Sequence, residues 1–135
     1  MSDISTIPTE LGVAEEWQLL NGSLWLAPES LDIRGMATTM LARGARFITI
    51  TAMQLPEDEA TRLDYHWDLN GELLTFTSKT ADKVVPSICD LCPAADWIER
   101  EIHEYFTVDF EGHEYEPLLV REGEPVGVLV PEEDA

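Results

Sequence analysis

The chain has 135 residues, of which 44% are hydrophobic, and its 27 acidic and 8 basic residues give a formal net charge of −19. This length and composition fit one compact domain with a core of its own. The acidic excess argues against direct binding to nucleic acid or to an anionic membrane, because each phosphate contact needs a cationic side chain. The charge fits either a solvated acidic surface or one that attracts a basic protein partner.

The N-terminal segment lacks the basic and then apolar pattern of a secretory leader. The longest apolar runs, such as "VGVLV" at residues 126–130, are far shorter than the roughly 18 residues that a membrane-spanning helix needs. We therefore expect a cytoplasmic chain without direct membrane insertion.

The first predicted elements lie on either side of the Asn21-Gly22 pair. Residues 9–20, "TELGVAEEWQLL", have the composition of a short helix with Thr9 as its N-cap, followed by a strand over "SLWLA". A β-hairpin through Asn21-Gly22 is the alternative, and it would place Leu19 opposite Leu24.

A second helix is predicted over residues 28–44, with Pro28 near its start and Gly44 placed for a left-handed C-cap. Apolar residues at helical spacing form its buried stripe: Ile33, Met36, Ala37, Met40 and Leu41. The following segment, "ARFITITAMQL", carries apolar residues on both faces, which predicts a central strand over residues 45–55.

The Asn70-Gly71 pair between two β-rich runs predicts a hairpin with a two-residue loop. This loop fixes a register that sorts the apolar side chains onto one face. The expected cross-strand pairs are Trp67 with Leu74, Tyr65 with Phe76, His66 with Thr75, and Asp64 with Thr77.

A third helix is predicted from Pro93 to Phe106, with a buried stripe at spacings of four residues: Ala94, Ile98, Ile102 and Phe106. Its solvent-facing side is expected to carry the ion pairs Asp96–Arg100 and Glu99–His103. Helices and hairpin-connected strands alternate irregularly, which predicts an α+β fold: a mixed, mostly antiparallel sheet with helices packed on it. We expect a single domain with its core over about residues 10–116 and an extended tail over residues 117–135.

Cys89 and Cys92 form the one Cys-X-X-Cys motif, and thiols near a helix start are a redox signal. Pro93 follows the second cysteine, however, so the pair precedes the helix instead of opening it. A zinc site would need two more ligands, and the ten-residue separation of His103 and His113 misses the usual spacing. The sequence therefore predicts small buried apolar cysteines, no metal site and no cofactor bound by this chain.

The three histidines, including His66 in the middle of a strand, are dispersed along the sequence and predict structural or surface roles. The acidic pairs Glu99–Glu101 and Glu101–Glu104 fit a solvated helix face better than acid–base chemistry. No phosphate-binding loop or nucleophile elbow is present, so the residues by themselves favour an interaction module over an enzyme.

The segment "SICDLCPAADWIEREIHEYFTVDFEGHE" resembles the 30-kDa subunit of respiratory complex I (NADH-quinone oxidoreductase) and its counterparts in energy-converting membrane-bound NiFe hydrogenases and formate hydrogenlyases. The family signature is an E-R-E triplet followed by an acid, an aromatic, Gly-Ile, Phe and Gly-His-Pro. The matching positions here are Glu99, Arg100, Glu101, Glu104, Phe106, Val108, Phe110, Gly112 and His113. Thr107 stands where the family has Gly and Glu114 where it has Pro, which, with the short C-terminal part, favours a short hydrogenase-type branch.

The resemblance implies an α/β fold with a mixed sheet and a non-catalytic subunit in the cytosolic arm of a membrane-associated redox complex. The implied partners are the large catalytic subunit and the small iron–sulfur subunit, which would hold the iron–sulfur clusters and the NiFe or quinone site. The implied partner interface comprises Glu99, Arg100, Glu101, Glu104, Phe110, Gly112 and His113. The alternative is a stand-alone thiol oxidoreductase or redox sensor that uses Cys89 and Cys92.

Two further expectations concern the end of the third helix and the tail. Because a β-branched residue adopts positive φ only at a cost, Thr107 is expected at negative φ, with "VDF" leaving the helix as a short strand. The apolar residues of the tail, together with the Glu99–Glu101 turn, are expected to form one continuous docking surface. The alternative is that the tail folds back on its own sheet as an edge strand.

Overall fold

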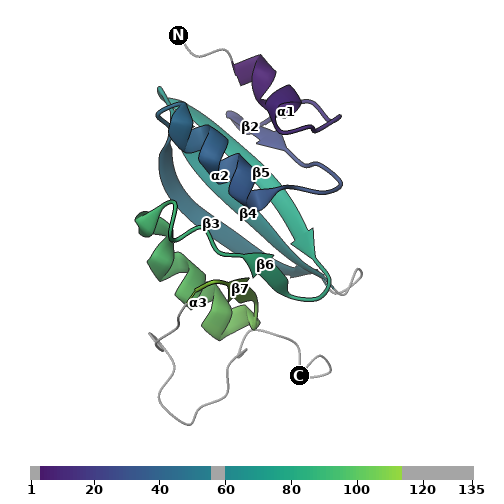
Figure 1. Ribbon diagram of the computed structural model, residues 1–135. Coiled ribbons are helices and arrows are strands. Elements are labelled where there is room, and N and C mark those ends of the chain that lie inside the picture. Colours follow the sequence, from purple (N-terminus) through teal and green to yellow (C-terminus); the bar gives the residue numbers. More distant parts are fainter. Residues whose placement is uncertain (1–3, 56–59, 114–135) are drawn as a thin grey trace.

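The computed structural model describes residues 4–55 and 60–113. The described residues form an α+β fold, coloured from purple at the N-terminal end towards yellow (Figure 1). In chain order the elements are a 3-10 turn at Ile4–Thr6, α1 Ile7–Glu10, β1 Gln18–Leu20, β2 Ser23–Leu26, α2 Ile33–Ala42, β3 Arg46–Leu55, β4 Ala60–Leu69, β5 Glu72–Thr80, β6 Val84–Pro86, a 3-10 turn at Pro93–Ala95, α3 Asp96–Phe106 and β7 Asp109–Glu111.

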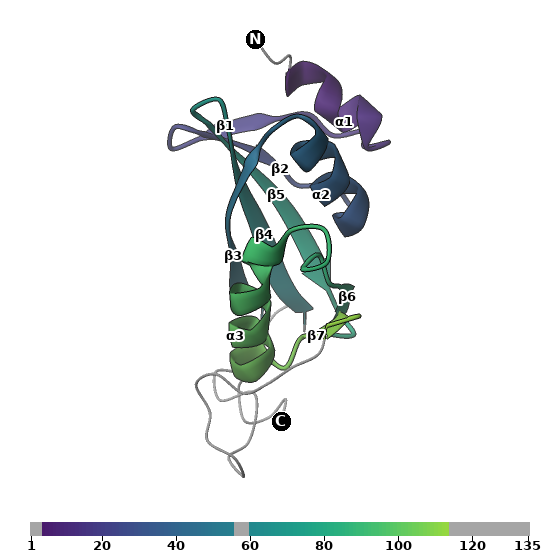
Figure 2. The ribbon, with the colours of Figure 1, turned by 60° about the vertical axis from the view of Figure 1, so that its left-hand side comes forward.

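The main sheet has five strands in the order β1-β2-β5-β4-β3. Within the described part of this sheet only the β2–β5 pair is parallel, so the prediction of a mixed, mostly antiparallel sheet is confirmed. Strands β6 and β7 form a separate two-stranded parallel sheet. Helices α2 and α3 and the β6–β7 pair lie on the same side of the main sheet (Figures 1 and 2). None of the helices in the described ranges is long and apolar enough to cross a membrane.

The predicted hairpin between β4 and β5 is confirmed in its register. Tyr65 pairs with Phe76 and Trp67 with Leu74, and the pairs expected on the other face are also present. Asn70 and Gly71 have φ of 54° and 89°. Positive φ at both loop positions is the geometry of a type I′ turn, which the Asn-Gly sequence favours.

Around Asn21-Gly22 the hairpin is present, and the predicted helix over residues 9–20 is wrong. Leu19 pairs with Leu24 across β1 and β2, as the alternative required. The helix in this region is the earlier single turn α1, with Thr6 at its N-cap position and Thr9 inside it. The positive-φ turn at Asn21 and Gly22 decides the structure of the segment that follows α1.

The second helix starts later than predicted, at Ile33, because the Asp32 side chain caps it by accepting a hydrogen bond from the Gly35 N–H at 3.0 Å. Pro28 therefore lies before the helix. The predicted C-terminal end is confirmed, with Gly44 at φ 81°. The buried stripe of α2 comprises Ile33, Met36, Ala37 and Met40.

The core lies between α2 and the inner face of the sheet, where Trp67 donates to the Met36 sulfur at 3.1 Å. The largest fully buried side chains come from the sheet and its covering elements: Trp67, Tyr65, Phe76, Phe110, Ile7, Leu26, Met36, Met40, Ile50, Leu63, Leu69 and Leu74. The prediction that residues 45–55 form a central strand is wrong, because β3 is the last strand in the sheet order of the described residues. Its inner side chains are apolar because α3 packs against them.

The third helix is present, but its buried face differs from the predicted one. Ala94 is exposed and its neighbour Ala95 is buried, while Ile102 is buried as predicted. Glu99 and Glu104 are also buried, so the expectation that the acidic residues lie on a solvated face is wrong for these two.

The prediction for Thr107 is also wrong: it lies in the left-handed region, at φ 58° and ψ 25°. The Thr107 N–H donates to the His103 carbonyl at 3.1 Å, which closes the last turn of α3. The Lys83 ammonium donates to the Phe106 carbonyl at 3.3 Å, so a helix-terminal acceptor is satisfied. The chain then reverses into β7, which confirms the expected short strand after the helix. The predicted tail over residues 117–135, its docking surface and its edge-strand alternative lie outside the described residues.

Candidate functional site

The family-like segment is built around the carboxylate of Glu99, which is 0% exposed. Its Oε1 accepts a hydrogen bond from the Ser87 hydroxyl at 2.5 Å, and its Oε2 accepts one from the Ile88 N–H at 2.9 Å. Burial raises the pKa of Glu99, although these hydrogen bonds and His113 act in the opposite direction. Glu99 therefore holds the loop of residues 87–92 against α3, inside the protein.

Asp96, in the first turn of α3, lies beside His113. One Asp96 oxygen is 2.7 Å from His113 Nε2, and the other is 3.2 Å from the Arg100 guanidinium. The predicted Asp96–Arg100 pair is thereby confirmed. The same histidine nitrogen is 3.8 Å from Glu99. Gly112, at φ 92°, makes the turn that carries His113 back towards the start of α3, where the Cys89 sulfur also lies.

The residues of the expected partner interface divide into two groups. Four are buried: Glu99, Glu104, Phe110 and His113. Gly112 is exposed, and Arg100 and Glu101 are half-buried. The buried residues support the fold from inside, and the docking role of all seven residues stays a prediction. Sequence spacing could not distinguish the two groups, because the burial of Glu99 depends on Ser87 in a separate segment.

The two cysteines differ in their surroundings. Both are free thiols. Cys92 is buried as predicted, its N–H donates to the Ile88 carbonyl at 2.7 Å, and burial raises the pKa of its thiol. Cys89 is only partly buried, so the prediction of two buried cysteines holds for Cys92 alone. A buried thiol with a raised pKa is a poor nucleophile, so Cys92 lacks the environment of an attacking redox cysteine.

The other two histidines make structural hydrogen bonds, in agreement with the sequence. His66 bridges Thr51 and Thr75 on the outer face of the sheet, at 3.0 and 2.8 Å. Burial lowers the pKa of His66, while Asp64 acts to raise it. His103 Nδ1 lies 2.9 Å from the Val108 carbonyl. Neither belongs to the group formed by Asp96, His113 and Cys89.

The exposed side of α3 carries a feature that was not predicted from the sequence. Trp97 is 59% exposed, a high value for a large aromatic side chain. One turn later, Glu101 lines a groove of about 340 Å³ between α3 and β3. The other lining residues are Thr49, Ile50, Thr51, Ala52, Ile98, Ile102, Tyr105 and Phe106. The sequence signal that could have indicated this feature is the i, i+4 spacing of Trp97 and Glu101.

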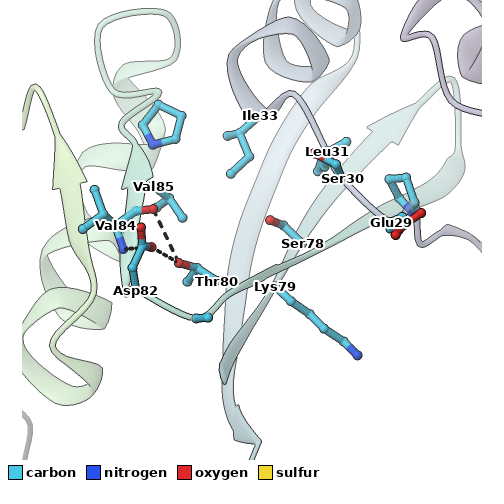
Figure 3. A pocket seen from close by; sticks show the side chains of 13 residues that line it. Glu29, Ser30, Leu31, Ile33, Ser78, Lys79, Thr80, Asp82, Val84 and Val85 are labelled. Atoms are coloured by element: carbon cyan, nitrogen blue, oxygen red, sulfur yellow. Dashed lines mark hydrogen bonds between the residues drawn. The ribbon is translucent and has the colours of Figure 1, made fainter. Parts of the chain in front are cut away.

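Another cavity, of about 430 Å³, lies between the loop before α2 and the segment from the end of β5 to β6 (Figure 3). Asp82 accepts hydrogen bonds there from the Thr80 hydroxyl at 2.8 Å and the Val84 N–H at 3.1 Å, which lower its pKa. The Lys79 side chain extends away from these groups (Figure 3). Asp82 thus stabilises the turn into β6, and its carboxylate does not converge with the Lys79 ammonium on a ligand position.

The comparisons agree with the resemblance of the α3 segment. Residues 29–127 match the family described as respiratory-chain NADH dehydrogenase, 30 Kd subunit. An NADH-quinone oxidoreductase subunit of Ruegeria sp. (strain TM1040) is 31% identical over 106 residues, which is 72% of this chain and 52% of the relative. The corresponding subunit of Ruegeria pomeroyi is 38% identical over 76 residues, which is 53% of this chain and 38% of the relative. The chain thus spans about half, or less, of the length of these curated relatives.

Two solved structures show the same fold. A chain in the membrane-bound sulfane sulfur reductase, an archaeal respiratory membrane complex, superposes with a TM-score of 0.78 at 24% identity, covering 96% of this chain and 80% of the other. A trypsin-resistant fragment of Nqo5 superposes with a TM-score of 0.60 at 21% identity, covering 74% and 89%. With the match over residues 29–127, the chain belongs to the family of the 30 Kd subunit of respiratory-chain NADH dehydrogenase.

Proposed function

We propose that this chain is a non-catalytic subunit of a membrane-associated respiratory redox complex, of the NADH-quinone oxidoreductase or the energy-converting hydrogenase type. The observation that carries the proposal is the family match over residues 29–127. The relatives named as NADH-quinone oxidoreductase subunits and the fold shared with a chain of an archaeal respiratory membrane complex support it. In this proposal the chain binds peripherally, in the cytosolic arm, and stabilises the assembled complex.

The proposed partner is the large catalytic subunit, with the small iron–sulfur subunit as its neighbour. The redox centres, which are iron–sulfur clusters and a NiFe or quinone site, would reside in these partners. A net charge of −19 favours a basic partner surface, because complementary charge speeds encounter and fixes orientation.

The outer face of α3 is the docking surface that we propose, with Trp97, Arg100 and Glu101 as its centre. Trp and Arg side chains often contribute most of the binding energy at an interface. Trp97 is exposed and Arg100 is half-buried. The Glu99 hydrogen bonds hold the backbone of α3, which carries these side chains, against the loop of residues 87–92. The ten-residue strand β3 lies alongside α3.

The thiol oxidoreductase alternative would be favoured by an exposed and acidic Cys92. The thiol is instead buried, and its pKa is raised. No observation on the described residues favours that function over the subunit role.

The test uses the full chain, affinity-tagged and expressed in its own cells, with recovery of partners from detergent-solubilised membranes. The parent chain should recover the large subunit, and Trp97→Ala combined with Glu101→Lys should reduce that recovery about tenfold or more. Leu19→Ala is the matched control, because Leu19 is 72% exposed on β1, at the other edge of the sheet from β3. Absence of the large subunit from the parent sample, or NADH- or thiol-dependent turnover by the chain alone, would contradict the proposal.

A further inference from the structure

Three side chains from separate segments meet at the start of α3: Cys89 of the 87–92 loop, Asp96 of the first helical turn and His113 after β7. One ligand atom of each, the Cys sulfur, a carboxylate oxygen and a ring nitrogen, lies within 4.8 Å of the other two. We propose that these residues bind one zinc ion, with water as the fourth ligand. This inference does not depend on the proposed function.

The distances fit a metal that enters with small side-chain movements. Tetrahedral zinc holds sulfur at about 2.3 Å and nitrogen or oxygen at about 2.0–2.2 Å, which places neighbouring ligand atoms roughly 3.3–3.7 Å apart. The Asp96–His113 contact, now 2.7 Å, would open slightly, and the Cys89 sulfur would approach both groups.

The donor set selects the kind of metal. One thiolate, one imidazole and one carboxylate suit borderline Zn²⁺, whereas Ca²⁺ and Mg²⁺ prefer oxygen ligands throughout. Cys89 would lose its proton to solvent on binding. Because zinc has no redox chemistry, the bound ion would not act as an electron carrier.

The surroundings hold all three ligands in position. Arg100 contacts the second Asp96 oxygen at 3.2 Å, and the Ser87 hydroxyl accepts a hydrogen bond from the Cys89 N–H at 3.1 Å. The parallel β6–β7 pairing brings the segment before His113 alongside the segment before Cys89, and the Ser87 N–H donates to the Glu111 carbonyl at 2.9 Å. Such supporting contacts orient metal ligands and tune their affinity.

Glu99 adds a second carboxyl group close to the site, with its Oε1 3.8 Å from His113 Nε2. The sequence argued against a zinc site because His103 and His113 do not have the usual spacing. In the structure the two side chains that lie beside Cys89 are Asp96 and His113, and no linear motif would reveal this combination. Cys92 does not belong to the group.

The test uses the full chain, stripped with a chelator and titrated with Zn²⁺ and with Co²⁺ as a spectroscopic probe. We expect one tightly bound zinc per chain, a higher melting temperature with zinc, and a thiolate-to-cobalt charge-transfer band. Cys89→Ala should remove the cobalt band and weaken zinc binding by more than about 100-fold, beyond the range typical of residues that only support a ligand. Asp96→Asn should weaken it as well.

Cys92→Ala is the matched cysteine control and should keep the cobalt band. His66→Gln, which alters a histidine outside the group, is a second control if the buried Cys92 variant does not fold. Circular dichroism of each variant in its metal-free form establishes that the variant is folded. The proposal is overturned if the parent chain binds no stoichiometric zinc, if folded Cys89→Ala binds zinc as the parent does, or if His66→Gln abolishes binding.

Discussion

The Ser87 hydroxyl donates a hydrogen bond of 2.5 Å to the fully buried carboxylate of Glu99. This contact joins the loop before α3 to the helix itself, and it gives the first residue of the E-R-E triplet a structural role. The outward-facing residues of the same helix take no part in this contact. A family signature can therefore include a residue that supports the fold from inside.

Replacing Glu99 with Ala should lower the free energy of unfolding by about 2 kcal/mol or more, because the Ile88 N–H and the Ser87 hydroxyl would lose a buried acceptor. Chemical denaturation of the isolated chain measures the loss. Glu101→Ala on the half-buried side of the same helix is the control and should change stability by about 0.5 kcal/mol or less. Equal effects of the two substitutions would show that the Glu99 contacts do not stabilise the fold.

The raised pKa of Glu99 predicts a pH dependence whose sign is fixed. A carboxyl group with a raised folded-state pKa favours the folded state when it is protonated. Its contribution is fully present below the unfolded pKa, about 4.3, and is lost as the pH rises through the higher folded value. The free energy of unfolding of the parent chain, minus that of Glu99→Gln, should therefore decrease as the pH rises from the unfolded pKa through the folded pKa. A difference that stays constant or increases would mean that burial does not control this group.

Thr107→Gly should stabilise the chain by about 1 kcal/mol, because Thr107 occupies the left-handed region at a steric cost that glycine does not have. The substitution removes the contact of 3.2 Å between Lys83 and the Thr107 hydroxyl, which is exposed and contributes little. Thermal unfolding of the two proteins gives the comparison. A lower melting temperature for the glycine variant would show that side-chain contacts outweigh the backbone strain.

The two thiols should differ in reactivity. Metal-free native chain treated with an alkylating reagent should be modified at the partly buried Cys89 first, and at Cys92 only after unfolding, since burial raises the pKa of the Cys92 thiol. Peptide mass spectrometry assigns the modified residue. Rapid alkylation of Cys92 in the folded chain, or ready formation of a Cys89–Cys92 disulfide, would favour the alternative function as a thiol oxidoreductase or redox sensor.

The features predicted best from the sequence are those that depend on local chemistry. The Asn70-Gly71 turn determined the β4–β5 register, and Gly44 marked the end of α2. The position of β3 at the edge of the described sheet was missed, because a helix covering one face gives a strand the same apolar pattern as central placement does.

The candidate site was predicted as a segment, but its internal arrangement was not. The burial of Glu99 depends on the hydrogen bond that its carboxylate accepts from Ser87, in a loop more than ten residues earlier. The meeting of Cys89 with His113 depends on the parallel β6–β7 pair, whose three-residue strands are too short to give a pattern in the sequence. Both features need tertiary contacts between segments that carry no shared motif.

We propose that the outer face of α3 docks on the large subunit. Photocrosslinking from position 97 tests this docking, with a photoreactive amino acid replacing Trp97 in the chain expressed in its own cells. Mass spectrometry of the adduct should identify the large catalytic subunit, and the same reagent at position 19 on β1 should give little or no such adduct. If position 97 gives no adduct with that subunit, or if both positions give equal adducts, the outer face of α3 does not dock there.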